Sequence, residues 1–172
     1  MTTTIDFARL TLQDALDLAI LIEEEARDRY LELAQFVGGR YPGDAGDVFR
    51  TMAGNEEKHG AQLAGRRREL FGRRRPRVDR SMLFDVEAPD LGAVRVFMSA
   101  RQAVEVALAS EQKAHDFFDE ALEHVKDRQV KKLFEELKTE EKAHQAALRK
   151  LMRKLPRGPD VEESEADEPP PM

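Results

Sequence analysis

Apolar residues recur at alternating steps of three and four along four long stretches of the chain, which is the spacing of one buried face on an α-helix. Two of these stretches begin with a string typical of a capping box, TLQD at Thr11 and SARQ at Ser99. We therefore predict helices from about Thr11 to Gly38, from near Asp44 to Gly72, from near Ser99 to Val125, and from Asp127 to just before Pro156.

The connections between these helices differ in length, and the difference indicates the topology. Short links join the first helix to the second and the third to the fourth, so each pair is expected to form an antiparallel hairpin. Residues 73–92, between the second and third helices, contain two prolines and suit a crossover along a bundle. The sequence thus predicts an all-α four-helix bundle over residues 1–155. The acidic, proline-rich tail, residues 156–172, is expected to be disordered.

The composition supports this fold class and removes several chemistries. Charged residues make up 36% of the 172 residues and aromatic residues only 6%, which favours helices with solvated outer faces. A net charge of −6 gives no reason to expect nucleic acid as a partner. The absence of cysteine excludes disulfides, zinc–cysteine sites and thiolate catalysis. The N-terminus does not resemble a signal peptide and no apolar run is long enough to span a membrane, so we expect a cytoplasmic protein.

Two of the four histidines fall on the predicted buried faces, each three residues after a glutamate. Glu56 and His59 form this pair in the second helix, and Glu141 and His144 form it in the fourth. Positions three apart on a helix differ by about 60° and rise by about 4.5 Å, so each glutamate and its histidine point the same way. Each pair therefore offers a carboxylate and an imidazole to the interior.

The first and third helices each add one glutamate near mid-length on the inward face, Glu23 and Glu111. Glu111 follows Glu23 by 88 residues and Glu141 follows Glu56 by 85, so the chain consists of a repeated helix hairpin with related polar residues in each half. Four ionised carboxylates in one core are tolerable only with compensating cations. Two divalent ions balance the charge, and mixed carboxylate and imidazole ligands suit iron or manganese better than calcium.

These residues resemble the ligand pattern of the ferritin-like di-iron carboxylate family, in which two helices give a Glu and two give a Glu-x-x-His. Within that group the chain most resembles rubrerythrin-type proteins, whose first helix carries Glu-x-x-Ala-x-x-x-Tyr, here Glu23, Ala26 and Tyr30. The resemblance covers roughly residues 11–155 and implies a ferritin-like bundle that holds two iron ions, with manganese as an alternative. The implied metal ligands are Glu23, Glu56, His59, Glu111, Glu141 and His144.

The chain departs from the rubrerythrin pattern in two respects. It has no cysteine-rich rubredoxin domain, and the third helix has Ala114 where those proteins usually carry a second acid. That acid is associated with the family's peroxide chemistry, so its loss argues against a peroxidase role. Without it, six ligands remain. The next residue, His115, is expected to be a partly exposed surface histidine, with a role at the site as the alternative.

The resemblance implies a di-iron oxidoreductase that reacts ferrous iron with peroxide or O2, either as a peroxidase or as a ferroxidase. Glu56 and Glu141 are expected to bridge the two ions. Tyr30 is the candidate catalytic residue, as a hydrogen-bond donor to a ligand or a bound oxygen species, and a plain core tyrosine is the alternative. Electrons would come from an external donor protein, unless iron itself is the substrate. We also expect a homodimer.

Other functions remain open on the sequence alone. They are iron storage or detoxification, a dimanganese catalase, and a non-enzymatic, metal-stabilised interaction bundle. The run from Arg66 to Arg80 holds eight arginines against Glu69 and Asp79. We interpret this run as a solvated helix end and loop, with a docking patch for an acidic redox protein, or for the chain's own acidic tail, as the alternative.

Overall fold

The computed structural model describes residues 5–83 and 86–157 of the chain. Its four α-helices are α1 (Leu12–Val37), α2 (Ala45–Phe71), α3 (Ala100–His124) and α4 (Arg128–Lys154). Three 3₁₀ turns accompany them: η1 (Phe7–Arg9) before α1, and η2 (Arg80–Met82) and η3 (Leu91–Ala93) between α2 and α3. The described residues contain no strand, so the predicted all-α class is confirmed.

Local side chains fix the points at which the helices begin. Thr11 and Asp14 form a capping box at the start of α1, and Ser99 and Gln102 form another at the start of α3. Helices α2 and α4 begin with simple N-caps, in which the side chains of Asp44 and Asp127 accept hydrogen bonds from backbone N–H groups of the first turn. All four helix starts therefore agree with the sequence prediction to within one residue.

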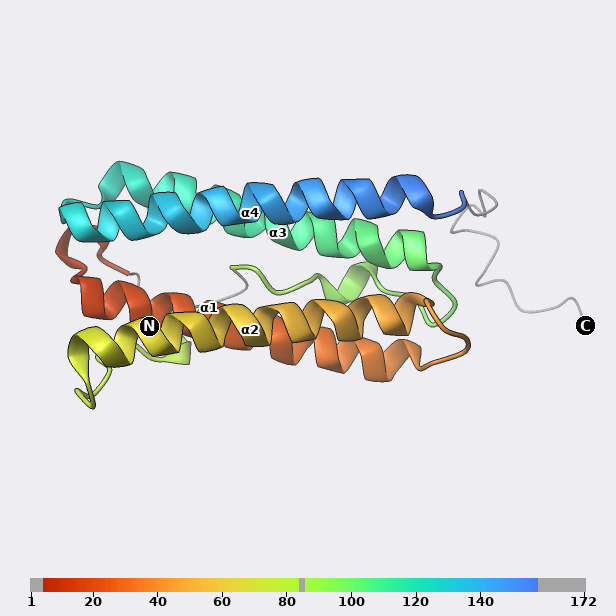
Figure 1. The fold of residues 1–172 in the computed structure, drawn as a ribbon, viewed down its shortest axis with the longest axis horizontal. Helices are drawn as coiled ribbons and strands as arrows, with labels where there is room; N and C mark the ends of the chain where they lie inside the picture. Colours follow the sequence, from red (N-terminus) through yellow and green to blue (C-terminus); the bar gives the residue numbers. More distant parts are fainter. Residues whose placement is uncertain (1–4, 84–85, 158–172) are drawn as a thin grey trace, which may run out of the picture.

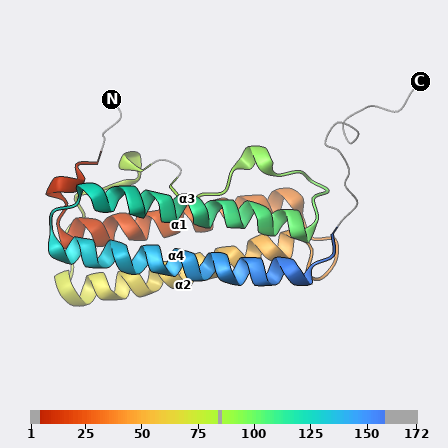
Figure 2. The same cartoon turned by 90° about the horizontal axis from the view of Figure 1, so that it is seen from above.

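Helices α1 and α2 form one antiparallel hairpin and α3 and α4 form the other, and the two hairpins stack to make the bundle (Figure 1). The chain between α2 and α3 runs back along the bundle on the side where α1 and α3 lie (Figure 2). Helices α2 and α3 approach each other more closely than α1 and α3 do, so this crossover lies where the bundle is more open. The predicted four-helix bundle with a long connection between the second and third helices is confirmed.

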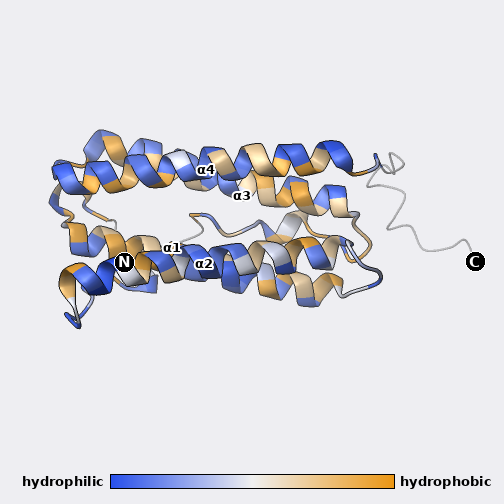
Figure 3. Cartoon of the chain, in the orientation of Figure 1, coloured by the Kyte–Doolittle hydropathy of each residue, from blue (hydrophilic) through white to orange (hydrophobic). Residues whose placement is uncertain are grey.

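The apolar core consists of two clusters along the bundle axis. One cluster contains Ile22 of α1, Phe118 of α3 and Leu137 of α4, and the other contains Tyr30 of α1 and Leu148 of α4. The four inward-facing glutamates fall between these clusters in each helix, so a polar layer interrupts the core near its middle. Apolar and polar positions alternate along every helix in the hydropathy view (Figure 3).

Ion pairs hold the crossover and its flanks against the helices. Arg77 pairs with Asp14 at 2.5 Å, and Arg80 pairs with Asp28 at 2.8 Å, both on α1. On α3, the Nζ of Lys113 donates a hydrogen bond to the carbonyl oxygen of crossover residue Ala88. The crossover is thus fastened to both helices that it lies beside.

The arginine run is partly used inside the molecule. Arg67 is buried and pairs with Asp17 of α1 at 2.7 Å, and its guanidinium also donates to the carbonyl oxygens of Gly72 and Arg74. Arg66 pairs across the bundle with Glu136 of α4 at 2.8 Å. Part of the run therefore closes the end of the bundle and does not lie free in solvent.

Within the part of the chain that the structure describes, no helix is both long enough and apolar enough to cross a membrane. The predicted disordered tail lies almost entirely outside the described residues.

Candidate metal centre

The six predicted ligands converge at mid-bundle, in the layer between the two apolar clusters. The four glutamates are almost fully buried, with exposed fractions of 6% for Glu23, 1% for Glu56, 0% for Glu111 and 2% for Glu141. Carboxylates are seldom buried to this degree unless they are paired or bind a metal.

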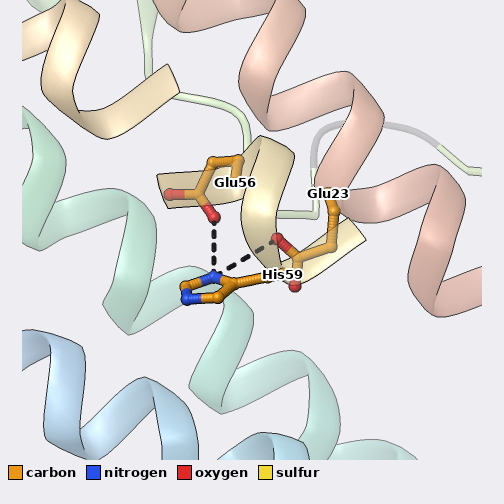
Figure 4. A group of neighbouring side chains, drawn as sticks. All are labelled: Glu23, Glu56 and His59. Atoms are coloured by element: carbon orange, nitrogen blue, oxygen red, sulfur yellow. Dashed lines mark ion pairs between the residues drawn. The ribbon is translucent and has the colours of Figure 1, made fainter. Parts of the chain in front are cut away.

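The first group of ligands is built by α1 and α2. The Nδ1 atom of His59 lies 3.4 Å from a carboxylate oxygen of Glu56 and 3.8 Å from one of Glu23 (Figure 4). The three residues can each present one ligand atom within 4.8 Å of the others. The helical spacing of Glu56 and His59 places both on the inward face of α2, where Glu23 meets them from α1.

The second group, from α3 and α4, repeats this arrangement. The Nδ1 atom of His144 lies 3.0 Å from an oxygen of Glu111 and 3.5 Å from one of Glu141. Again the three ligand atoms come within 4.8 Å of one another. Each hairpin of the duplicated chain thus supplies two carboxylates and one imidazole.

The two groups are adjacent. The imidazole rings of His59 and His144 stack with their centroids 4.5 Å apart and their planes 4° from parallel. A carboxylate oxygen of Glu56 also comes within 4.8 Å of one from Glu111 of the opposite hairpin. The six side chains therefore form one cluster with a donor set on each side.

Several buried carboxylate oxygens of the cluster lack hydrogen-bond partners among the described residues, and this observation supports metal binding. Glu23, Glu111 and Glu141 each have one buried carboxylate oxygen without a hydrogen-bond partner among the described residues, and both oxygens of Glu56 are in this position. Such oxygens are costly in a protein interior unless a cation or a proton satisfies them. The donor set consists of four carboxylates and two imidazoles, arranged as one Glu-Glu-His group from each hairpin. Such a set fits a pair of transition-metal ions.

The electrostatics of the metal-free cluster agree with this interpretation. Burial and the nearby charges of Glu56 and Glu141 raise the pKa of Glu23 well above its usual value. Burial and the proximity of Glu111 raise the pKa of Glu141 to about 8, although His144 acts against them. Burial lowers the pKa of His144, but its hydrogen bond to Glu111 and the nearby carboxylate of Glu141 outweigh burial and raise that pKa to about 11. Protons thus take up the negative charge that cations would otherwise balance.

A further buried glutamate, Glu87, was missed by the sequence reasoning. It lies on the crossover, is 2% exposed, and has no hydrogen-bond partner for either carboxylate oxygen among the described residues. One of its oxygens comes within 4.8 Å of oxygens from Glu56 and Glu111. Burial and the charges of the surrounding glutamates raise its pKa well above the usual range. No periodic pattern marks this residue, and the only local signal is an acid between apolar neighbours, in VEAP.

Tyr30, the predicted catalytic residue, is fully buried about two helical turns after Glu23 on α1. Its ring stacks on Phe49 at 6.2 Å between centroids, and its hydroxyl has no hydrogen-bond partner among the described residues. Burial and the charge of Glu111 raise its pKa well above 10, so the hydroxyl keeps its proton and is available as a donor.

Ala114, at the place of the second acid, and the next residue, His115, have different surroundings. Ala114 is fully buried and offers only a methyl group to the interior. His115 is half-buried, its Nδ1 lies 3.0 Å from Asp116, and it belongs to none of the ligand groups described above. The structure does not bring His115 to the centre.

Comparisons with known proteins agree with the fold and with the cluster. The rubrerythrin family profile matches residues 14–152 and, in a second overlapping match, residues 102–170. No curated protein matches the sequence significantly.

Two solved structures are similar. An uncharacterised conserved protein from Magnetospirillum magnetotacticum MS-1 is 31% identical over 87% of this chain and 98% of its own, with a TM-score of 0.65. A hypothetical protein from Pyrococcus furiosus shares the fold at 24% identity, over 84% of this chain and 89% of its own, with a TM-score of 0.50. With its duplicated hairpins and its buried carboxylate and histidine groups, the chain belongs to the rubrerythrin family of ferritin-like proteins.

Proposed function

We propose that this protein is a di-iron oxidoreductase that reacts ferrous iron with peroxide or O2. The observation that carries the proposal is the cluster of two Glu-Glu-His groups, one from each hairpin, with unpartnered oxygens buried between them. The match to the rubrerythrin family and the donor set of this cluster support the same chemistry.

Each side chain has a distinct part in holding the ions. Glu23 and His59 would bind one ion, and Glu111 and His144 the other. Glu56 and Glu141 would be shared, which is supported for Glu56 by its short distances to ligand atoms of both hairpins. The shared role of Glu141 is supported by its effect on the opposite hairpin, where its charge contributes to the raised pKa of Glu23.

Bound iron would supply reversible one-electron chemistry toward an oxygen species, and the protein controls the surroundings of that reaction. The two apolar clusters exclude water on both sides of the polar layer, which strengthens every electrostatic interaction inside it. The Tyr30 hydroxyl is a protonated donor without a partner among the described residues, so it is available to a bound small molecule. The chain has no cysteine to hold an iron–sulfur relay, so electrons would come from a separate donor protein, or from ferrous iron as substrate.

Stopped-flow absorption of the anaerobically iron-loaded protein, mixed separately with peroxide and with O2, tests the proposal. Oxidation that is fast with one oxidant identifies the substrate. Iron-loaded protein that reacts with neither oxidant contradicts the oxidoreductase function. Continued uptake of iron beyond about two ions per chain, in a closed assembly, indicates storage instead.

Tyr30→Phe distinguishes a catalytic tyrosine from a core tyrosine. The variant keeps the ring that packs on Phe49 and removes only the unpartnered hydroxyl. We expect unchanged iron binding and a slower reaction with the oxidant, by about 10-fold or more if the hydroxyl donates to the reacting group. An unchanged rate assigns Tyr30 to the core.

A further inference from the structure

Glu87 is the buried acid that the duplicated hairpins do not explain. The crossover enters the bundle at this point, since Val86 and Ala88 on either side of Glu87 are also buried. A buried carboxylate normally has at least one hydrogen-bond donor, but neither oxygen of Glu87 has one among the described residues. The side chain has therefore been taken out of water without a visible partner.

The neighbours of Glu87 are carboxylates, and they point to a cation as its partner. Its oxygen, one of Glu56 and one of Glu111 all lie within 4.8 Å of one another. These two glutamates come from opposite hairpins, so Glu87 faces the region between the two donor groups. Three carboxylates at these distances repel one another, and a cation between them converts that repulsion into attraction.

The local structure holds Glu87 in this position. The hydrogen bond from Lys113 to the carbonyl of Ala88 ties the next residue of the crossover to α3. Upstream, Arg80 pairs with Asp28 and ties the crossover to α1. One turn after Glu111, α3 itself presents only the methyl group of Ala114, so it supplies no second ligand.

We propose that Glu87 is a seventh protein ligand of the metal centre, contributed by the crossover. This inference rests on the proposed di-metal centre and adds to it a ligand from outside the four helices. It makes the crossover part of the site, so metal binding would further stabilise the chain around residue 87. The alternative is a purely structural acid that stays protonated in the core.

The test compares Glu87→Gln with Asp90→Asn, a matched control on the same crossover. Asp90 is exposed and caps η3, and asparagine keeps that capping oxygen. Ferrous iron is titrated anaerobically into each metal-free protein in competition with a chromophoric chelator. We expect Glu87→Gln to weaken the binding of at least one ion by about 10-fold or more, and Asp90→Asn to bind as the wild type does.

A second readout separates a ligand from a structural acid. Replacing a repelling carboxylate by an amide should raise the melting temperature of the metal-free protein, while the rise in melting temperature on iron loading becomes smaller. If Glu87 is only a structural acid, Glu87→Gln should change the melting temperature in the same direction in the metal-free and the iron-loaded protein. Hydrogen exchange of peptides that contain residue 87 should slow on iron loading in the wild type, and slow less in Glu87→Gln.

Glu87→Asp, which keeps the charge and shortens the reach, provides a second test should the amide variant fold poorly. Weaker iron binding by the aspartate variant supports the proposal. Wild-type affinity in both Glu87 variants overturns it. Failure of the di-metal centre itself is a different result, because the wild-type protein would then bind no ferrous iron in the same titration.

Discussion

The metal-free protein is predicted to lose stability as the pH rises through the neutral range. Folding raises the pKa of Glu141 from 4.5 to about 8. A carboxyl whose pKa is raised by folding stabilises the fold while it is protonated, so this contribution is complete below the unfolded pKa and is lost as the pH rises to about 8. His144 acts in the same direction, because its pKa rises from 6.5 to about 11 and its contribution is lost between these values.

The expected magnitude is large. With a folded pKa of about 8, and at about 1.4 kcal/mol per pKa unit, moving from about pH 8 to about pH 5 stabilises the metal-free fold by about 3 kcal/mol through Glu141 alone. Domains of this size are stable by only about 5–15 kcal/mol in total. Glu23 and Glu87 act in the same direction, but the groups interact, so their contributions are not added.

The assay is urea unfolding of chelator-treated protein at several pH values, followed by far-ultraviolet circular dichroism. Glu141→Gln should flatten the pH dependence, whereas Glu140→Gln, at an exposed neighbour on the same helix, should leave it unchanged. Carboxyls whose pKa is lowered, such as those of Asp14 and Asp28, lose their contribution only below about pH 4, outside this window. A metal-free stability that is constant or increases from about pH 5 to about pH 8 would refute the reasoning.

Two further predictions concern the scaffold. Arg67→Met leaves the buried carboxylate of Asp17 without its partner, so the free energy of unfolding should fall by about 2 kcal/mol, measured by urea unfolding; an unchanged value would mean that the pair contributes nothing. Gly46→Ala should destabilise the protein by about 2 kcal/mol or more, because an added Cβ would lie 2.2 Å from the carbonyl oxygen of Gly38. Gly54→Ala is on the same helix, and an added Cβ there meets open space, so this substitution should stabilise the protein by about 0.5–1 kcal/mol and raise its melting temperature. Equal effects of the two glycine substitutions would contradict the packing argument.

The convergence of the six candidate ligands was predictable because the helical period converts spacing into direction. A glutamate and a histidine three residues apart must share a face, and that face was fixed by the apolar residues around them. The capping boxes at Thr11 and Ser99 set the helix starts by local hydrogen bonds alone, so the sequence also located these. The fold and the grouping of the glutamates and histidines therefore followed from interactions within single helices and from the repetition of the hairpin.

The crossover was not predictable in the same way. Its residues have no periodicity, and their positions depend on the path that the chain takes along the side of the bundle where α1 and α3 lie (Figure 2). The partners that direct this path, Lys113 for Ala88 and Asp28 for Arg80, are 25 and 52 residues away along the chain. Several arginines that looked like a solvated run are likewise ion-paired with distant helices, which no local pattern reveals.

The central claim is that buried acids from both hairpins are held together in one core by cations. Metal analysis and anaerobic ferrous titration of the wild type and of the double variant Glu56→Gln/His59→Ala test it directly. The account predicts about two iron ions per wild-type chain, and loss of the paired centre in the variant while its helical circular dichroism is retained. Full metal content in the variant, or no iron bound by the wild type, would contradict it.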